Sequence, residues 1–307
     1  MQHHVSRHLK QYLLLIRLPN VFTAPSNILA GYFAAAAVTS DKTSSGDLVV
    51  LQLPLLIVSS CLLYIAGIVL NDYFDFEIDK KERPFRPLPS GAIAKRHALA
   101  IALGAILIAN IVALVAAGPT GAAVTLAITA AIIAYDWRLK HGPFGPLAMG
   151  IPRLLNVILG AAPALLYLSA TSYAILGTAS FSLFLYVVAI TILSKKEVGS
   201  EKANSTISFL MIFGVICLIV ALGLLVVKFQ WVFLVNLSIF TSVIIVTFKQ
   251  HLSGEFPSIQ KAVRNLVISI IILDSIFISG AAGPLYGFAI LLLILPSIGL
   301  AKKLYVT

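Results

Sequence analysis

The sequence predicts an all-α membrane protein: a transmembrane bundle of about nine or ten helices, forming one domain over residues 1–307. Of the 307 residues, 59% are hydrophobic and only 11% are charged, and the mean hydropathy is +1.00. Soluble domains carry about a quarter charged residues, so we expect the lipid bilayer to cover much of this surface. Two further patterns support the prediction, namely apolar stretches near the ~20 residues that a spanning helix needs and an alternation of basic and non-basic loops.

Apolar stretches follow one another along the chain and are separated by turn residues such as Gly118-Pro119 and Gly283-Pro284. Each stretch predicts one helix. They lie near residues 21–39, 49–70, 98–117, 120–137, 145–168, 174–193, 206–227, 230–248, 264–281 and 284–301. The last two are also compatible with a single broken hairpin, which lowers the expected number of spans from ten to nine.

The basic residues predict the orientation of the bundle. Of the 22 Lys and Arg residues, 19 lie at the termini or in alternate loops that the predicted helices place on one side. Only Lys42 and Lys228 fall on the other side, and Arg153 falls inside a span. Because cytoplasmic loops are enriched in Lys and Arg, we expect both termini and the charged loops to be cytoplasmic. Topology thereby explains the net charge of +10, and no nucleic-acid partner is expected.

An acidic cluster ends the second apolar stretch, where Asn71-Asp72-Tyr73-Phe74-Asp75-Phe76-Glu77-Ile78-Asp79 holds four of the twelve acidic residues. On a continuing helix, Asp72, Asp75 and Asp79 share one face. Carboxylates so close together repel each other unless cations neutralise them. Their oxygens suit Mg²⁺, which commonly bridges to phosphates. The alternative is a solvated acidic loop that balances its basic neighbours, and the regular spacing argues against it.

A basic, proline-rich segment follows, Lys80-Lys81-Glu82-Arg83-Pro84-Phe85-Arg86-Pro87-Leu88-Pro89-Ser90-Gly91. A helix does not continue through these prolines, so the segment must form a loop. A loop that returns over the helix end would bring Arg86, and with it Arg83, close to the carboxylates. There a guanidinium could bind a phosphate that the metal also binds. The alternative role for these residues is to anchor the loop on the cytoplasmic side.

The segment NDYFDFEID followed by RPLPSG resembles the first aspartate-rich motif, NDxxDxxxD, and the RPLxSG element of the UbiA superfamily of intramembrane prenyltransferases. The resemblance implies a helix bundle in which aspartates hold Mg²⁺ and bind a prenyl diphosphate, whose allylic carbon alkylates an acceptor. It implies that Asn71, Asp72, Asp75 and Asp79 are catalytic, with the three aspartates as metal ligands, and that Arg86 binds substrate. The acceptor, aromatic or lipid, is not identified by the sequence.

The segment Tyr135-Asp136-Trp137-Arg138-Leu139-Lys140 ends the fourth apolar stretch. It is similar to the YSxxLK segment of many family members, which contributes a lysine to the diphosphate site. The resemblance therefore implies that Lys140, and with it Tyr135, binds substrate. The alternative is that the aromatic residues anchor the helix at the membrane interface and the basic residues flank it on the cytoplasmic side.

Within the fifth apolar stretch, Arg153 and Asn156 lie at positions i and i+3 and can face the same side of a helix. A charge inside a membrane usually faces a cavity or a partner. One candidate partner of Arg153 is a substrate phosphate or carboxylate, so both residues are predicted to bind substrate. The equally weighted alternative is a salt bridge between Arg153 and Asp274, the other charge within a span.

The chain departs from the family after the sixth apolar stretch, where the family carries a second aspartate motif, DxxxD. Here the segment Ser194-Lys195-Lys196-Glu197-Val198-Gly199-Ser200-Glu201-Lys202 contains no aspartate. Glu197 and Glu201 keep an i, i+4 carboxylate pair beside Lys195 and Lys196, and we predict that they bind substrate. This half of the site would bind diphosphate through cations or hold one metal fewer. Together with GPLAMGIPRLLN at residues 145–156, the altered motif is similar to the EboC-like branch of the family.

Three functions are compatible with these patterns. The leading hypothesis is a Mg²⁺-dependent prenyltransferase whose apolar helices hold the isoprenoid chain away from water. The second is a UbiA-like protein that binds or moves a prenylated or diphosphate-bearing metabolite without chemistry, which the altered second motif favours. The third is a secondary transporter. Transporters place broken helices at the bilayer midplane, whereas this acidic cluster lies at a helix end.

Overall fold

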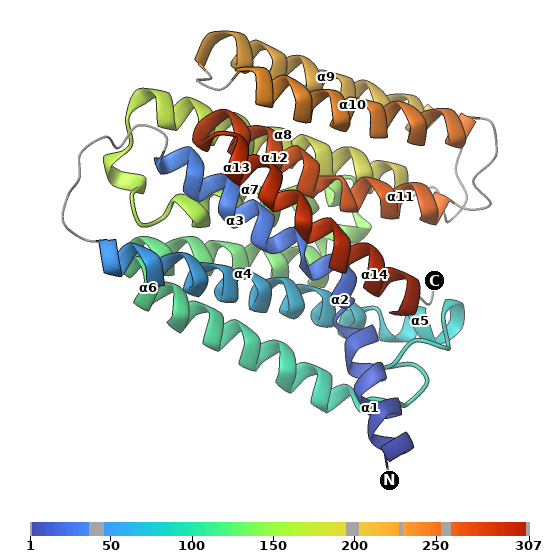
Figure 1. The fold of residues 1–307 in the computed structure, drawn as a ribbon. Coiled ribbons are helices and arrows are strands. Elements are labelled where there is room, and N and C mark those ends of the chain that lie inside the picture. The colour runs from blue at the N-terminus through green and yellow to red at the C-terminus, as the bar shows by residue number, and fades with distance from the viewer. Residues whose placement is uncertain (1, 37–45, 195–202, 227–229, 253–258, 305–307) are drawn as a thin grey trace.

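The computed structural model describes residues 2–36, 46–194, 203–226, 230–252 and 259–304, and in these ranges all regular secondary structure is helical. Figure 1 shows long helices stacked in layers, with the two termini at the same end of the bundle. The helices are α1 (Gln2–Leu15), α2 (Leu18–Val21), α3 (Thr23–Ala36), α4 (Gly46–Phe74), α5 (Phe76–Glu82), α6 (Lys95–Trp137), α7 (Gly145–Ala161), α8 (Ala170–Ser194), α9 (Ala203–Val226), α10 (Gln230–Leu252), α11 (Ile259–Ile268), α12 (Ile270–Ala282), α13 (Pro284–Ala289) and α14 (Ile294–Leu304). Short 3-10 turns lie at Leu139–His141, Leu165–Tyr167 and Ile290–Leu293.

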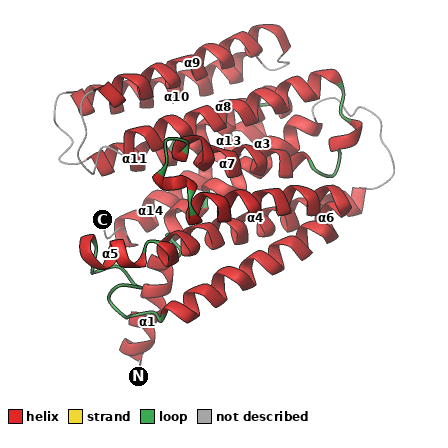
Figure 2. Ribbon diagram, turned by 180° about the vertical axis from the view of Figure 1, so that it is seen from behind, coloured by secondary structure: helices red, strands yellow, loops and turns green. Residues whose placement is uncertain are grey.

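The predicted apolar stretches coincide with these helices. Within the described ranges, six helices are long and apolar enough to cross a membrane, and the bent pair Leu9–Leu15 and Leu18–Ala36 makes a further candidate span. The shorter helices α7 and α9 are apolar as well. The predicted all-α membrane fold is therefore confirmed (Figure 2).

Helix α6 is a hairpin of two antiparallel helices. Its 43 residues would form a straight helix of about 65 Å, roughly twice the thickness of a bilayer core. The backbone instead leaves the helical region at Ala117 and at Gly118, whose φ of 60° is left-handed. The Asn110 amide donates a hydrogen bond of 3.3 Å to the Thr129 hydroxyl, although 19 helical residues would separate them by about 28 Å. The turn predicted at Gly118-Pro119 is thus present.

Small residues let helices α4 and α6 approach each other closely. Alanines of the first half of α6 are buried at spacings of three or four residues, namely Ala98, Ala102, Ala105, Ala109, Ala113 and Ala116. Helix α6 packs extensively on α4, where the Ser59 hydroxyl donates a hydrogen bond of 2.8 Å to the Ala109 carbonyl. Small residues at this spacing are typical of packed membrane helices, because they permit short distances between backbones.

Helices α3 and α7 cross even more closely. A Cβ atom added at Gly31 of α3 would collide with the Val157 carbonyl of α7, and one at Gly160 of α7 would collide with the Ile28 carbonyl of α3. Only glycine fits at either position. This crossing brings the polar residues of α3 against Arg153 and Asn156 of α7.

A second tight reversal links α12 to α13. Gly283 has a φ of 95°, which glycine adopts without strain. A Cβ atom at Gly287 would collide with Ser279, so α13 folds back along α12. The segment predicted as two spans or one broken hairpin is therefore a hairpin at this point.

Candidate active site

The charged site lies where α4 ends and α5 begins. The backbone hydrogen bonds from Asp75 N to Asn71 O (2.9 Å) and from Asp79 N to Asp75 O (2.8 Å) continue across the junction. The two helices therefore form an almost continuous path, and the three aspartates keep the helical spacing that the sequence predicted. Asp72 and Asp79 are 4% and 1% exposed, so their carboxylates are largely removed from water.

The proline-rich loop returns over this helix end, as the sequence predicted. Leu88 and Ile93 are buried and hold the loop against the bundle. Arg86 Nη1 lies 2.7 Å from Asp79 Oδ2 and 3.5 Å from Asp72 Oδ1. Arg83 lies at 3.8 Å from Asp79 Oδ1. One guanidinium therefore bridges two buried carboxylates that are seven residues apart.

A cation–π contact fixes the far end of the same loop. The ammonium of Lys95, the first residue of α6, lies 4.5 Å from the centroid of the Tyr73 ring and 4.9 Å from that of Phe76. Such contacts stabilise a cation over an aromatic face. The loop is thus tied to the aspartate-rich segment at its middle and at its end.

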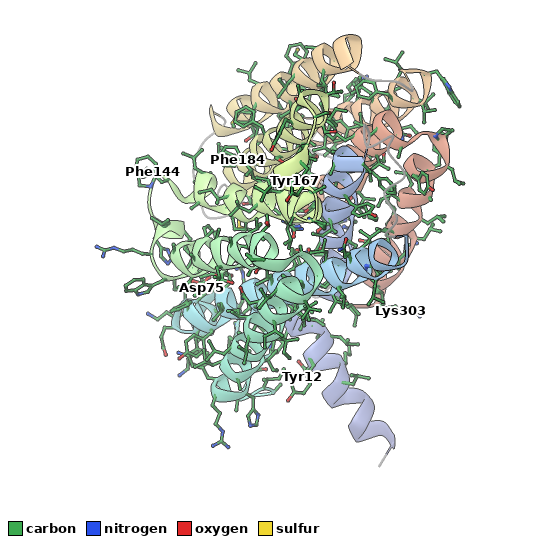
Figure 3. All side chains as sticks on the ribbon, turned by 90° about the vertical axis from the view of Figure 1, so that its left-hand side faces the viewer. Tyr12, Asp75, Phe144, Tyr167, Phe184 and Lys303 are labelled. Atoms are coloured by element: carbon green, nitrogen blue, oxygen red, sulfur yellow. The ribbon has the colours of Figure 1, made fainter. Side chains whose placement is uncertain are left out.

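The second basic segment also reaches the aspartates. Lys140 lies in the turn after α6, and its Nζ is 2.6 Å from Asp75 Oδ1. The side chain of Lys140 is 7% exposed and that of Asp75 is 20% exposed. In Figure 3, Asp75 lies within the bundle, whereas Phe144 of the following loop projects outward. The hairpin of α6 is what brings Lys140 back to the end of α4.

Two charged residues of this site were not predicted to belong to it. Arg17 Nη2 lies 2.7 Å from Asp72 Oδ1, and Arg17 has a left-handed backbone (φ 46°, ψ 52°) at the bend before α2. Asp136 is 2% exposed and accepts a hydrogen bond of 3.0 Å from the Asn71 amide. The sequence signals were a basic residue two positions before Pro19 and an acidic residue between Tyr135 and Lys140. Arg17 was counted only among the basic residues of the amino-terminal region, and Asp136 was given no role.

The electrostatics of the site favour a polyanion. Arg17 and Arg86 both approach the same oxygen of Asp72. Burial lowers the pKa of the Arg86 guanidinium from its ordinary value, and the nearby charge of Arg17 adds to this effect, while Asp72 and Asp79 oppose it. The two guanidinium groups repel each other at this one oxygen. A ligand with several negative oxygens would offer each guanidinium a separate oxygen to bind.

The donor set fits Mg²⁺ bound jointly with a phosphate. Among the residues that the structure describes, no three His, Cys, Asp or Glu side chains are close enough to hold a metal by themselves. The predicted convergence of three carboxylates is therefore not observed, because Asp75 faces Lys140 while Asp72 and Asp79 share Arg86. Mg²⁺ usually needs only one or two carboxylates and takes its other oxygens from phosphates and water. Asp72 and Asp79, held by one guanidinium, form such a pair.

The remaining predicted residues lie elsewhere or outside the described ranges. Arg153 and Asn156 of α7 are buried and belong to a separate polar cluster deeper in the bundle. The predicted alternative, a direct salt bridge from Arg153 to Asp274, is not among the ion pairs of the described chain; Asn27 lies between them. Tyr135 lies beside Asp136 in the last turn of α6. Glu197 and Glu201 fall outside the described residues.

Comparison with known proteins gives the same family. The model of the UbiA prenyltransferase family matches residues 26–252. Digeranylgeranylglyceryl phosphate synthase from Methanococcoides burtonii is 34% identical over 136 residues, 44% of this chain and 48% of that protein. The enzyme of the same name from Methanothrix thermoacetophila is 32% identical over 187 residues, 58% of this chain and 61% of that protein. The chain thus matches about half the length of these curated relatives.

Solved structures show the same fold. A UbiA homologue from Aeropyrum pernix K1 has a TM-score of 0.64 at 17% identity, with 84% of this chain and 96% of that chain covered. A UbiA homologue from Archaeoglobus fulgidus, bound to GPP and Mg²⁺, has a TM-score of 0.64 at 14% identity, with 92% and 99% covered. The family match covers well over half of the chain, and the aspartate-rich segment lies within it. The chain belongs to the UbiA prenyltransferase family.

Proposed function

We propose that the protein is a Mg²⁺-dependent prenyltransferase that transfers an isoprenyl group from a prenyl diphosphate to an acceptor within the membrane. The observation that supports it most is the alternation of carboxylates and cations at the end of α4. Arg86 lies between Asp72 and Asp79, and Lys140 contacts Asp75. Carboxylates that hold a metal, interleaved with cations, are what the recognition of a diphosphate requires.

Each charged residue has a role in this proposal. Asp72 and Asp79 would hold Mg²⁺, which supplies Lewis-acid stabilisation of the leaving diphosphate. Asp75 would add a third carboxylate once Lys140 turns from it toward the donor. Arg86, Lys140 and Arg17 would turn from the carboxylates toward the diphosphate oxygens when the donor binds. The amide of Asn71, fixed by its hydrogen bond to Asp136, would face the donor from the same helix end. Relatives named digeranylgeranylglyceryl phosphate synthase and the solved homologue bound to GPP and Mg²⁺ support the donor class.

The transfer itself requires that one bond breaks and one forms. The C–O bond between the allylic carbon and the diphosphate breaks, and its electron pair leaves with the diphosphate. The acceptor's oxygen or carbon then bonds to the allylic carbon and loses a proton to the released diphosphate. Preorganised cations around the leaving group stabilise the charge that develops there. The apolar helices below the site would exclude water from the carbocation.

The first experiment measures the thermal stability of the purified protein with geranylgeranyl diphosphate, with and without Mg²⁺. A ligand at 100 times its Kd stabilises the folded state by about 2.7 kcal/mol, so the Tm should rise when both are present. Asp72→Ala and Asp75→Ala should lose this rise and all transfer activity while the protein stays in the membrane. Glu77→Gln is the matched control, because Glu77 lies in the same segment and is exposed.

Wild-type activity in either alanine variant would contradict this assignment of the site. A Mg²⁺-dependent rise in the wild type without release of diphosphate for any acceptor would instead favour the second candidate, a protein that binds or moves a prenyl diphosphate. The absence of aspartate from residues 194–202 is the observation that favours this candidate. Measurement of diphosphate release on the same samples therefore separates the two functions.

A further inference from the structure

Two polar contacts join the end of α4 to the end of α6. The Asn71 amide donates a hydrogen bond of 3.0 Å to Asp136 Oδ1, and Lys140 Nζ lies 2.6 Å from Asp75 Oδ1. Asn71 and Asp75 are four residues apart in the chain, as are Asp136 and Lys140. The two contacts are therefore neighbours, about one helical turn apart along α4.

The two contacts differ in how well their atoms are satisfied. Lys140 Nζ and Asp75 Oδ1 are buried, but neither atom forms a hydrogen bond within the described part of the chain, although they lie close together. Asp136 is 2% exposed, and its contact with Asn71 is a hydrogen bond. Because a buried polar atom without a hydrogen bond is costly, a ligand that offers new partners opens the contact of Lys140 more readily than that of Asp136.

The carboxylate of Asp136 determines how the Asn71 amide is oriented. An ionised carboxylate only accepts hydrogen bonds, so it selects the orientation in which the NH₂ group of Asn71 faces α6. The side-chain carbonyl oxygen of Asn71 then points away from Asp136, and among the described residues it accepts no hydrogen bond. The YSxxLK segment, which residues 135–140 resemble, has a serine at the position of Asp136. A hydroxyl both donates and accepts, so a serine there permits either orientation of the amide.

We propose that Asp136 is a positioning residue of the donor site. Its carboxylate holds the Asn71 amide so that the side-chain carbonyl oxygen is available to Mg²⁺, which accepts carbonyl oxygens as ligands. It also keeps the end of α6 against α4 when Lys140 turns from Asp75 toward the diphosphate. The inference rests on the proposed transferase function and adds to it a residue that acts on the donor only through its neighbours, as residues around a metal site orient the ligands.

The test titrates Mg²⁺ into the purified protein in the presence of excess geranylgeranyl diphosphate and records the Tm at each concentration. The Mg²⁺ midpoint, the concentration that gives half of the full rise in Tm, reports binding and needs no acceptor. Loss of a residue that orients a metal ligand weakens metal binding by roughly 10–100-fold, so Asp136→Ala should raise the midpoint by about ten-fold or more. Asp136→Asn should raise it less, because its amide still accepts a hydrogen bond from Asn71 but also donates.

A matched change on the same helix separates this role from a structural one. Thr129→Ala removes the hydrogen bond that joins the two arms of the α6 hairpin through Asn110. It should lower the Tm without ligands and leave the Mg²⁺ midpoint unchanged. Asp136→Asn should do the opposite, because an amide of the same volume keeps the contact between α4 and α6. If Asp136 were only structural, its variants would behave as Thr129→Ala does.

An exchange of the two side chains tests the pair even if Asp136→Ala does not fold. Asn71→Asp alone places a second carboxylate where the hydrogen bond of 3.0 Å stood. The two like charges repel each other, so the Tm without ligands should fall. The double exchange, Asn71→Asp with Asp136→Asn, restores a hydrogen bond between a carboxylate and an amide and leaves one oxygen at position 71 available. It should recover both the Tm and the Mg²⁺ midpoint.

Either of two results would overturn the inference: a wild-type Mg²⁺ midpoint in Asp136→Ala, or in Asp136→Asn if the alanine variant does not fold, or a double exchange that leaves the midpoint unrecovered. The proposed function fails separately, when the wild type shows no Mg²⁺-dependent response to geranylgeranyl diphosphate. A normal response in the wild type with an unchanged midpoint in the variants therefore refutes only the role of Asp136.

Discussion

Two buried carboxylates share the side chain of Arg86, whose Nη1 lies 2.7 Å from Asp79 and 3.5 Å from Asp72. Each carboxylate also has a second, more exposed arginine partner: Arg17 contacts Asp72 and Arg83 lies near Asp79. The loss of Arg86 therefore weakens the pairing of both aspartates without leaving either of them isolated. It also removes the cation that lies between Asp72 and Asp79, two of the proposed metal ligands.

Arg86→Ala should consequently lower the free energy of unfolding by about 1.5–3 kcal/mol, the range for a hydrogen bond to a charged group. It should also abolish the rise in Tm that geranylgeranyl diphosphate and Mg²⁺ produce. Arg86→Lys should recover part of the stability and less of the donor response, because an ammonium cannot bridge as a planar guanidinium does. Thermal unfolding with and without donor measures both effects, and Arg96→Ala, an exposed change at the same end of the bundle, is the control. An undiminished donor response in Arg86→Ala would remove Arg86 from the binding site.

The sequence predicted the contacts between residues that are close together in the chain, and it missed the contacts between residues that are far apart in the chain. The helical spacing of Asp72 and Asp79 and the return of Arg86 follow from residues 71–91, because periodicity and proline positions are local properties. Arg17 contacts Asp72 across 55 residues, and nothing in the sequence indicates which of many basic residues bends back. Asn27 lies between Arg153 and Asp274 because of the way in which α3, α7 and α12 cross, and the sequence does not indicate this crossing either.

The crossing of α3 and α7 is the element on which the deeper polar cluster depends. Gly31 and Gly160 each face a backbone carbonyl of the other helix. Sequence periodicity predicted both helices, but it carries no information on their crossing point. The crossing places Thr23 and Asn27 within hydrogen-bonding distance of Arg153, so a change in helix separation alters the cluster without touching a polar residue.

Gly31→Ala should therefore destabilise the protein by about 1–3 kcal/mol, the usual cost of extra volume in a packed interior. The rise in Tm that geranylgeranyl diphosphate and Mg²⁺ produce should persist, because the aspartate-rich end of α4 lies away from this crossing. Gly177→Ala is the control, because Gly177 is exposed on α8 and its added Cβ would meet no atom within 4 Å; alanine favours the helix there. Thermal unfolding with and without geranylgeranyl diphosphate and Mg²⁺ measures both effects. An unchanged Tm in Gly31→Ala would mean that α3 and α7 separate readily.

The whole bundle places both termini and the charged site at one end (Figure 1). The 3-10 turn at Leu165–Tyr167, between α7 and α8, lies at the opposite end of these helices from Lys140, since α7 runs away from the turn that contains Lys140. The distribution of Lys and Arg predicts that the end with the charged site is cytoplasmic. The prenyl diphosphate would then enter from the cytoplasmic side.

Cysteine labelling tests this orientation. In a background without Cys61 and Cys217, Tyr167→Cys should react with a membrane-impermeant maleimide in intact cells, because Tyr167 is 83% exposed. Lys303→Cys and Glu82→Cys, both exposed at the other end, should react only in inside-out vesicles or after permeabilisation. The reverse pattern would place the charged site on the external side and contradict a cytoplasmic donor.

The reversal at Gly118 affects the order in which the two polar clusters form during synthesis of the chain. Because α6 doubles back, Lys140 reaches Asp75 within one continuous segment of chain. Arg17, Asp72, Asp79, Arg86 and Asp136 all precede Lys140 as well. Every ion pair described around the aspartates can therefore form once residue 140 has emerged from the ribosome, while the second half of the bundle is still being synthesised. Arg153 and Asp274 are synthesised later, so the charged site at the end of α4 forms before the polar cluster around Arg153.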